Sequence, residues 1–507
     1  MPFDSINRRD FIALSAVGAA GVLGLGTRSP AQVGRDDWDP DKSLVRTGKP
    51  LTIQPILMYR VAEQRPMTSW KSWGGVQSDE AAAKEAATIA RELSALDATM
   101  ARVLPVASVT TVEQAARAHE NDYDVVIVYA ASGSGDLLKA CFAPKKDRDT
   151  IVFVRCRSGP AYYWYEALST KYLQVGQAEA RPASRADHGG VRVEDVVVDD
   201  YDELRWRLRG LYALKNFLGT RIVALGGPWG KYAPDAPQIA RERYGFEIID
   251  VSYDAIAPRI RAARDDRELT ARAAQWTDKY LSVPNTTLAT DKAFVANAFL
   301  LYRLFKDLMH EHEASAFTIR GCMGTILPMA QTTACLTLSL LNDEGVMAFC
   351  ESDFVIIPAG VLLYYTCGRP VFLHNSTFPH DGIVTCAHCT APRRLDGGRY
   401  DPATIVTHYE SDYGAAPKVD MPVGREVTFI DPEYSTGRWL GFTGIVKSNP
   451  AYEICRSQQD VEIQGDWRKL LNEVRDSHWM MACGNHLKPL AYAARKLGIQ
   501  WTELPQS

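Results

Sequence analysis

Two carboxylates, Glu351 and Asp353, stand between two apolar runs in the segment GVMAFCESDFVIIPAG, residues 345–360. Burying an unpaired carboxylate is costly, or it shifts the pKa until the group becomes neutral. In an extended chain, side chains two residues apart point to the same face, so these carboxylates would repel each other. A shared divalent cation would offset that repulsion. The pattern therefore predicts a metal or substrate site, and the alternative is a solvated strand end in a surface loop.

A histidine opens an amphipathic helix in WMMACGNHLKPLAYAARKLGI, residues 479–499. Gly484 or Asn485 would cap this helix and leave His486 in its first turn. From there an imidazole could reach over a sheet edge into a cleft, where it would be a good ligand for an ion such as Mn²⁺ or Zn²⁺. A lone histidine at a helix start is more often structural. The interpretation of His486 as a metal ligand therefore depends on the other clusters.

Two further segments contain histidines. HNSTFPHDGIVTCAHCTAPRR, residues 374–394, holds three of them, and His388, at the end of a strand-like run, is the best candidate for a functional side chain. In VTHYESDYG, residues 406–414, His408 and Glu410 alternate on a β-type stretch and could contact a substrate. An ordinary surface strand would show the same alternation.

Composition describes the chain that must position these residues. With 507 residues it is too long for one core, and about three domains are expected. A hydrophobic content of 46% and a net charge of −4 are typical of a globular protein and argue against a nucleic-acid partner. No internal run reaches the roughly 18 apolar residues of a membrane span. No nicotinamide, flavin or nucleotide pattern is present, so no cofactor-binding residues of those kinds are predicted.

Short β-type runs alternate with helical patterns from residue 51 onward, which indicates βαβ units and parallel sheets. LTIQPILMY, DVVIVYA and TIVFVRC read as buried strands, and DEAAAKEAATIARELSAL as an amphipathic helix. A breaker-rich segment at 176–190 marks a boundary, and a long helical stretch at about 256–312 ends the second unit. The predicted division is a linker at 34–50, an N-terminal α/β domain at 51–180, a second α/β domain at 181–312 and a C-terminal domain at 313–507.

The N-terminus, residues 1–33, resembles an export signal. Arg8 and Arg9 precede a moderately apolar stretch rich in Ala and Gly, followed by a plausible cleavage region near Ala31. This twin-arginine pattern predicts a periplasmic or otherwise extracytoplasmic protein with no membrane span after the signal is removed. Disulfides could form there, but the ten cysteines are dispersed, and only Cys386 and Cys389 have a CxxC spacing. Most cysteines are therefore interpreted as small buried side chains.

Together these segments resemble the L-fucose and L-arabinose isomerases. NDEGVMAFCESDFVIIPAGVLLYYTCGRPVF is similar to the stretch of those enzymes that places a carboxylate on the catalytic manganese, and ACGNHLKPL to the segment that supplies a metal-binding histidine. CAHCTAPRRLDG falls where the strand between them belongs. The resemblance covers the C-terminal third, while the first two thirds match only in architecture. It implies an α/β fold with two Rossmann-like domains followed by a mixed α+β catalytic domain.

By resemblance, Glu351, Asp353 and His486 would bind a divalent metal ion, with Mn²⁺ expected. Glu351, Asp353 and His388 would be catalytic, and the substrate-binding residues would be His408, Glu410 and Asn485. The implied reaction is aldose–ketose isomerisation of a free sugar or sugar derivative through an enediol, carried out by a homo-oligomer that is hexameric in those families.

The chain departs from the isomerases at one place. They have a second acidic residue upstream of the carboxylate turn, whereas the corresponding segment here, GCMGTILPMAQTTACLTLSLL, contains no carboxylate. Two alternatives therefore stay open. One is a metal-dependent epimerase, lyase or hydrolase of a modified carbohydrate on the same fold, and the other is a catalytically degenerate sugar-binding protein.

Overall fold

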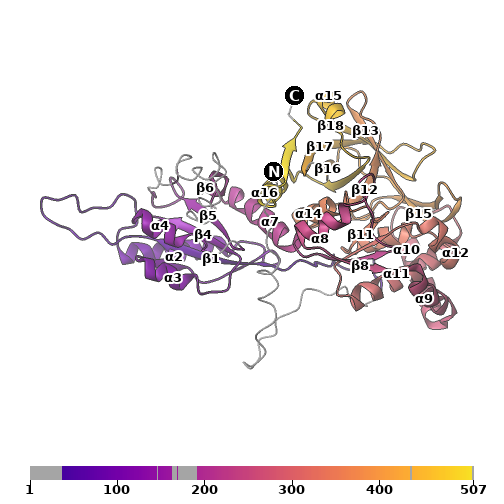
Figure 1. Ribbon diagram of the computed structural model, residues 1–507, viewed down its shortest axis with the longest axis horizontal. Helices are drawn as coiled ribbons and strands as arrows, with labels where there is room; N and C mark the ends of the chain where they lie inside the picture. The colour runs from indigo at the N-terminus through magenta and orange to yellow at the C-terminus, as the bar shows by residue number, and fades with distance from the viewer. Residues whose placement is uncertain (1–36, 145–146, 163–167, 169–190, 434–436, 505–507) are drawn as a thin grey trace. The chain divides into compact units, whose positions relative to one another are not determined.

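Figure 1 shows the computed structural model of the chain, which describes residues 37–144, 147–162, 168, 191–433 and 437–504. The chain divides into two compact units, one formed by Lys49–Lys215 and the other by Met1–Gly48 with Asn216–Ser507. The predicted export signal at 1–33 and the breaker-rich segment at 176–190 lie outside the described residues. Each unit is considered by itself below.

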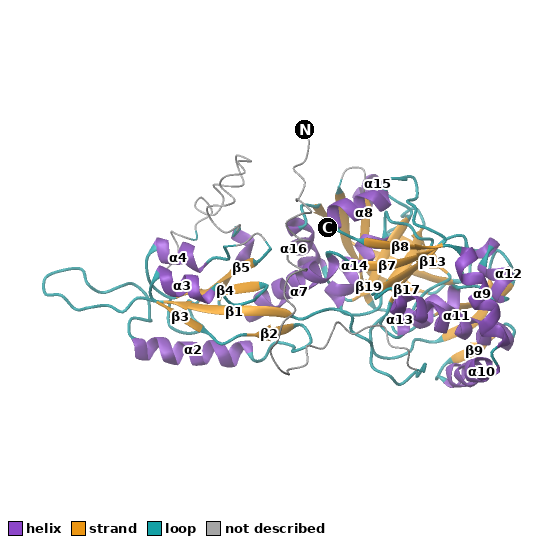
Figure 2. Cartoon of the chain, turned by 60° about the horizontal axis from the view of Figure 1, so that its bottom comes forward, coloured by secondary structure: helices purple, strands orange, loops and turns teal. Residues whose placement is uncertain are grey.

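The unit Lys49–Lys215 is built on a parallel sheet with the strand order β2-β1-β4-β5-β6, to which β3 adds by pairing with β1. Figure 2 shows α2 on one face of this sheet and α3 and α4 on the other. The helices change face because β2 and β4 lie on opposite sides of β1 and the crossovers between parallel strands are right-handed. Serine or threonine side chains cap all three helices, at Ser78, Thr111 and Ser134. The three predicted strands and the helix are confirmed. The elements are β1 (Leu51–Met58), α2 (Asp79–Leu93), β2 (Ala101–Val103), β3 (Ala107–Val109), α3 (Val112–Ala118), β4 (Val125–Ala130), α4 (Gly135–Cys141), β5 (Asp149–Val154), η1 (Val193–Asp195), β6 (Val196–Val198) and α7 (Tyr201–Phe217).

The second unit contains another parallel sheet, with the order β11-β10-β7-β8. Its strands are β7 (Arg221–Leu225), β8 (Glu247–Val251), β10 (Ala316–Ile319) and β11 (Met347–Cys350). The chain places β8 on one side of β7 and then returns to place β10 on the other side. The expected domain boundary between residues 312 and 313 therefore falls inside this sheet, because β7 and β10 come from opposite sides of that boundary and are hydrogen-bonded to each other.

The long helical stretch expected at about 256–312 is three helices. Asp266 separates α9 from α10, because its side chain accepts hydrogen bonds from the backbone N–H groups of Glu268 and Leu269 and so caps a new helix. A short strand and the Asp291 cap separate α10 from α11 in the same way. The elements of this region are α8 (Ala236–Tyr244), α9 (Tyr253–Asp265), α10 (Arg267–Ser282), β9 (Thr286–Leu288), α11 (Lys292–Glu311), η2 (Cys322–Gly324), α12 (Ile326–Ala330), α13 (Cys335–Asp343) and α14 (Ile357–Cys367).

A closed antiparallel β-barrel forms the last part of the chain. Its strands follow the order β16-β19-β12-β13-β18-β17, and the pairing of β17 with β16 closes the ring. Closure leaves no unpaired edge within the ring, and β20 adds to β17 from outside in parallel. β14 and β15 lie outside the barrel, in a three-stranded sheet with the order β15-β14-β9. The elements of this part of the chain are β12 (Phe372–Ser376), β13 (Ile383–His388), β14 (Ala403–His408), β15 (Tyr413–Val419), β16 (Glu426–Glu433), β17 (Arg438–Ser448), β18 (Ser457–Gln464), α15 (Trp467–Glu473), β19 (His478–Cys483), α16 (Leu487–Lys496) and β20 (Gln500–Glu503).

One hydrophobic core joins the second parallel sheet to the barrel. It runs from Phe299 on α11 and Phe317 on β10 to Phe429 and Trp479 inside the barrel. Such close-packed contacts hold strand ends in fixed positions relative to each other. The structure thus confirms a mixed α/β protein with parallel sheets and places a closed barrel where a mixed α+β domain was expected. Within the described residues, no helix is both long and apolar enough to cross a membrane.

Candidate functional site

The turn that follows β11 carries the two predicted carboxylates, but it is not extended. Glu351 and Ser352 have φ angles of 67° and 50°, in the left-handed region that few non-glycine residues adopt. The side chain of Trp229 donates a hydrogen bond to the Glu351 carbonyl, and Trp229 and Asp353 form a parallel β-bridge. The expectation that both carboxylates point to one face of a strand is therefore wrong. Backbone in this region is costly, and such strain is concentrated at functional sites.

Asp353 is completely buried and its carboxylate has three hydrogen-bond donors. The backbone N–H groups of Lys231 and Val355 donate to Oδ1 at 3.0 and 3.1 Å. The Nδ1 atom of His478 lies 2.6 Å from Oδ2 and must carry the proton, because an ionised carboxylate only accepts. Asp353 therefore fixes the orientation and tautomer of a buried histidine.

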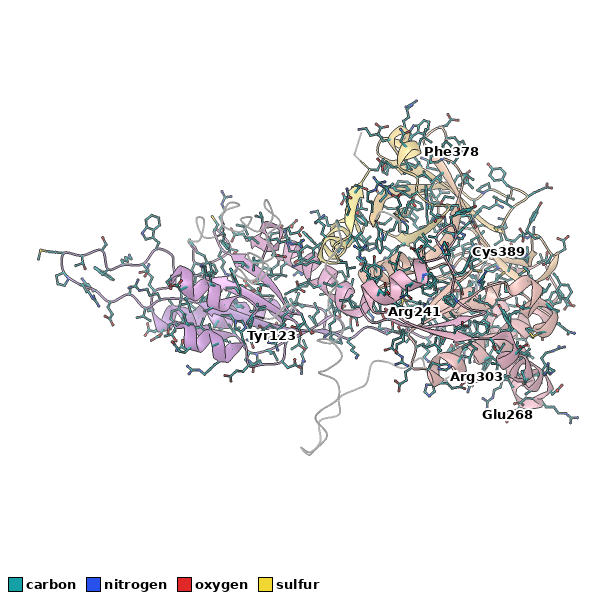
Figure 3. All side chains as sticks on the ribbon, viewed as in Figure 1. Tyr123, Arg241, Glu268, Arg303, Phe378 and Cys389 are labelled. Carbon is teal, nitrogen blue, oxygen red and sulfur yellow. The ribbon has the colours of Figure 1, made fainter. Side chains whose placement is uncertain are left out.

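Glu351 is the exposed member of the cluster, since 37% of its side chain is accessible to solvent. Two imidazoles from neighbouring regions of the barrel approach its two oxygens: Nε2 of His388 lies 3.4 Å from Oε1 and Nε2 of His478 lies 3.3 Å from Oε2. The other ring nitrogen of His388 lies 3.1 Å from the Thr390 hydroxyl. The Nδ1 atom of each ring is thus held by a neighbouring side chain, and the two Nε2 atoms face the same carboxylate. Figure 3 labels Cys389, the residue directly after His388, in this C-terminal part of the chain.

Charge in this cluster is concentrated on Glu351 and His478. Burial raises the pKa of Glu351, but the nearby His388 and His478 rings outweigh it and hold the pKa well below its usual range. Burial lowers the pKa of His478, but Asp353 and Glu351 outweigh that effect and raise the pKa to about 9. At neutral pH the site therefore contains a carboxylate that water can reach and an imidazolium that water cannot.

His374 and His408 lie close enough to this group to interact with it electrostatically. Burial, with smaller contributions from the neighbouring His388 and His478, lowers the pKa of His374 to about 3. His374 packs between aromatic rings, and its Nε2 atom has no hydrogen-bond partner within the described part of the chain. Burial also lowers the pKa of His408, which ends β14. Glu410 is exposed on the turn after β14.

His486 and Asn485 lie at the other end of β19 from His478. His486 is the N-cap residue of α16, and its Nε2 atom lies 2.8 Å from the Cys483 carbonyl oxygen. Asn485 is exposed, and its side chain accepts from the backbone N–H of Leu487 at 3.2 Å, which is a capping contact. The helix start was thus located to within one residue.

The structure does not bring the three predicted metal ligands together. Over the ranges that the structure describes, no three or more His, Cys, Asp or Glu side chains are arranged to hold a metal ion. The Asp353 carboxylate is already occupied by three donors, and His486 faces a backbone carbonyl. Glu351, Asp353 and His388 do lie together, with His478 in the place that the sequence analysis assigned to His486.

His478 is the residue that the sequence analysis missed. It opens the strand HWMMAC, directly after Asp476 and Ser477, and lies eight residues before His486, the histidine that the sequence analysis chose. β13 and β19 both pair antiparallel with β12, and Asn375 of β12 stands opposite both His478 and Ala387, the residue before His388. This register brings the two histidines to one level, and the sequence does not show it without knowing that both segments pair with β12.

The sequence matches no protein-family model, and no curated protein is significantly similar to it. What defines the class of this protein is therefore its architecture and its site: parallel α/β sheets, a closed barrel, and an acid–base cluster where the two meet.

Proposed function

We propose that this protein is a sugar isomerase-like enzyme, which interconverts an aldose and a ketose through an enediol. The supporting observation is the pairing of one partly exposed carboxylate, Glu351, with two oriented imidazoles at the carboxyl end of a parallel strand. Ligands of open α/β sheets bind outside the carboxyl ends of their strands. Moving a proton between adjacent carbons needs a base and an acid within reach of one substrate, and this cluster supplies both.

Each side chain has a role in this proposal. Glu351 takes the proton from the carbon beside the sugar carbonyl and returns it to the neighbouring carbon. His478, as an imidazolium, donates a hydrogen bond to the oxygen on which negative charge develops in the enediolate. His388 holds the second Glu351 oxygen until the substrate displaces it, and Asp353 positions His478. The buried His408 nearby is proposed to orient a sugar hydroxyl.

A divalent cation, Mn²⁺ by resemblance, belongs to the proposal with different ligands from those expected. The buried Nε2 atom of His478 lacks an aligned hydrogen-bond partner in the described chain, and such a nitrogen is a ready metal ligand once it is neutral. Glu351, His388 and, once it has lost its proton, His478 would have to rearrange to hold a cation here, because no three such side chains in the described residues are arranged to do so. It would supply Lewis-acid polarisation of the sugar oxygens. Export by the twin-arginine pathway and assembly into a homo-hexamer are parts of the proposal that rest on the sequence alone.

The test is conversion of a panel of free aldoses and ketoses in deuterated water, with products followed by NMR. An isomerase yields the paired sugar of the same mass and incorporates deuterium at the carbon that exchanges its proton through the enediol. We expect Glu351→Gln to lower the rate by at least about 100-fold, since general-base catalysis contributes 10²–10⁴-fold. Glu453→Gln is the matched control, because Glu453 is exposed on the loop before β18. Conversion that survives Glu351→Gln would contradict the assignment.

A second reaction at the same site is favoured by one observation. The segment 321–341, where the isomerases have another acid, contains no carboxylate; it forms η2, α12 and all of α13 except its last two residues, of which Asp343 is acidic. With one carboxylate instead of two, the site would also suit epimerisation, β-elimination or hydrolysis of a modified carbohydrate. Product analysis separates these reactions, because only isomerisation conserves mass and gives an aldose–ketose pair.

A further inference from the structure

A cation that forms no ion pair with the described residues lies at the carboxyl end of β10. Arg320 follows Ile319, which pairs in register with Cys350 on β11 and with Leu225 on β7. Arg320 is therefore the residue next to Glu351 across the sheet. Its side chain is exposed and forms no ion pair with any residue that the structure describes.

The backbone and the guanidinium of Arg320 are both held in place. The Arg320 backbone N–H donates to the Leu225 carbonyl at 2.9 Å, and the Arg320 carbonyl accepts from the Tyr253 hydroxyl. The guanidinium carbon lies 5.0 Å from the centre of the Trp229 ring, within the range of a cation–π contact. Because Trp229 also donates to the Glu351 carbonyl, the same ring ties Arg320 to the acid–base cluster. Stacking uses the face of the guanidinium and leaves its N–H donors available.

A second cation, Lys231, lies on the loop after β7. Its backbone N–H donates to Asp353, while its ammonium lies 6.0 Å from the Tyr232 ring and has no ion-pair partner in the described ranges. The carboxylates of Glu351 and Asp353 already interact with His388 and His478. Asp250 lies beside Gly227 and belongs to β8, which pairs with the side of β7 opposite to β10 and Arg320. The rim at β10 therefore has positive charge that forms no ion pair with any residue that the structure describes.

There is room for a ligand beside Arg320. A Cβ atom built on Gly321, the next residue, or on Gly324 would have no described atom within 4 Å. The position also lies between β7 and β10, where the strand order reverses. At such switch points the loops on either side diverge and leave a crevice that ligands occupy.

We propose that the substrate carries an anionic group, a carboxylate, phosphate or sulfate on a sugar, and that Arg320 binds this group. The inference rests on the proposed function and specifies its substrate class. A guanidinium matches carboxylate and phosphate oxygens with two parallel hydrogen bonds, which fixes the orientation of the ligand as well as its charge. Bound in this way, the anionic end of the sugar lies at β10 while its reacting carbons face Glu351 on β11. Lys231 adds charge from the other side of Asp353.

The test is calorimetric titration of the full chain with D-glucose, D-glucuronate and D-glucose 6-phosphate, and with the galactose series. We expect an acidic sugar to bind at least tenfold more tightly than its neutral parent, and Arg320→Gln to remove that preference while leaving neutral-sugar binding unchanged. Arg320→Lys should restore part of it. Arg267→Gln is the matched control, because Arg267 is an exposed arginine on α10. Comparison of glucuronate with the phosphate separates the two anionic groups.

Three outcomes decide the matter. Neutral sugars that bind as tightly as acidic ones overturn this inference and leave the proposed function standing. A preference for acidic sugars that survives Arg320→Gln, with the variant folded by circular dichroism, overturns the assignment to Arg320. Failure of every sugar, neutral or acidic, to bind counts against the proposed function and against this inference together.

Discussion

Replacing Asp353 by asparagine tests the central contact of the site. Asp353 and His478 are both completely buried, and the pKa of His478 is raised to about 9 by its two carboxylate neighbours. A folded-state pKa above the unfolded value of about 6.5 means that the interaction stabilises the fold fully below pH 6.5 and is lost as the pH rises through about 9. The difference corresponds to about 3 kcal/mol, close to the roughly 3–5 kcal/mol measured when one partner of a buried ion pair is removed.

Asparagine has nearly the shape of aspartate and can still accept from the backbone N–H groups of Lys231 and Val355. Its amide would face Nδ1 of His478 and so favour the other tautomer of that ring. We therefore expect Asp353→Asn to lower the free energy of unfolding by about 3 kcal/mol at pH 6.5 and by clearly less at pH 9, because the wild type has then lost most of this contribution.

The assay is urea unfolding of wild type and variant at pH 6.5, 7.5 and 9 in EDTA, so that bound metal does not contribute. Asp381→Asn is the matched control, since Asp381 is exposed and asparagine tolerates its left-handed backbone. An Asp353→Asn variant as stable as wild type, or a difference that does not shrink between pH 6.5 and 9, would refute the reasoning.

Three further predictions concern groups outside the reacting cluster. Burial lowers the pKa of His374 to about 3, so wild type should lose on the order of 4 kcal/mol of stability as the pH falls from about 6.5 towards 3, and acid unfolding of His374→Phe should show a shallower slope. Lys306 and Glu344 form a nearly buried ion pair at 2.9 Å, so Lys306→Met should cost about 3–5 kcal/mol in urea unfolding, and the double variant with Glu344→Gln should recover part of this loss. All ten cysteines are free thiols and Cys156 alone is exposed, so a thiol reagent should label one site rapidly, and Cys156→Ser should abolish that fast phase.

Some of the site follows from the sequence alone. Glu351 and Asp353 stand out because charged side chains between apolar runs need compensation, and the structure compensates both. His388 is identifiable because it ends a strand-like run, and β13 does end at this residue. These inferences succeed because they depend on local patterns: strand periodicity, burial of apolar runs and the cost of an isolated charge.

The strand and helix positions in the parallel sheets were also predictable. Continuous runs of β-branched and aliphatic residues, such as those of β1 and β4, are buried on both faces, which only a sheet covered by helices allows. Alternation with amphipathic helices then indicates parallel pairing. The pairing of β10 with β7 across the predicted boundary at residues 312 and 313 was not predictable in this way, because it joins segments about 90 residues apart and no local pattern records a distant partner.

The sequence by itself therefore determined which residues are chemically unusual and which segments are strands, since both depend on nearest neighbours along the chain. Only the tertiary structure decided which histidines meet which carboxylate. His478 contacts Asp353 across 125 positions of sequence, because the pairing of β19 and of β13 with β12 brings His478 and His388 to the same level, beside the turn after β11. The left-handed turn at Glu351 and the position of Arg320, which has no ion pair among the described residues, likewise arise from packing between strands. That packing is fixed by the shared core and not by the residues on either side.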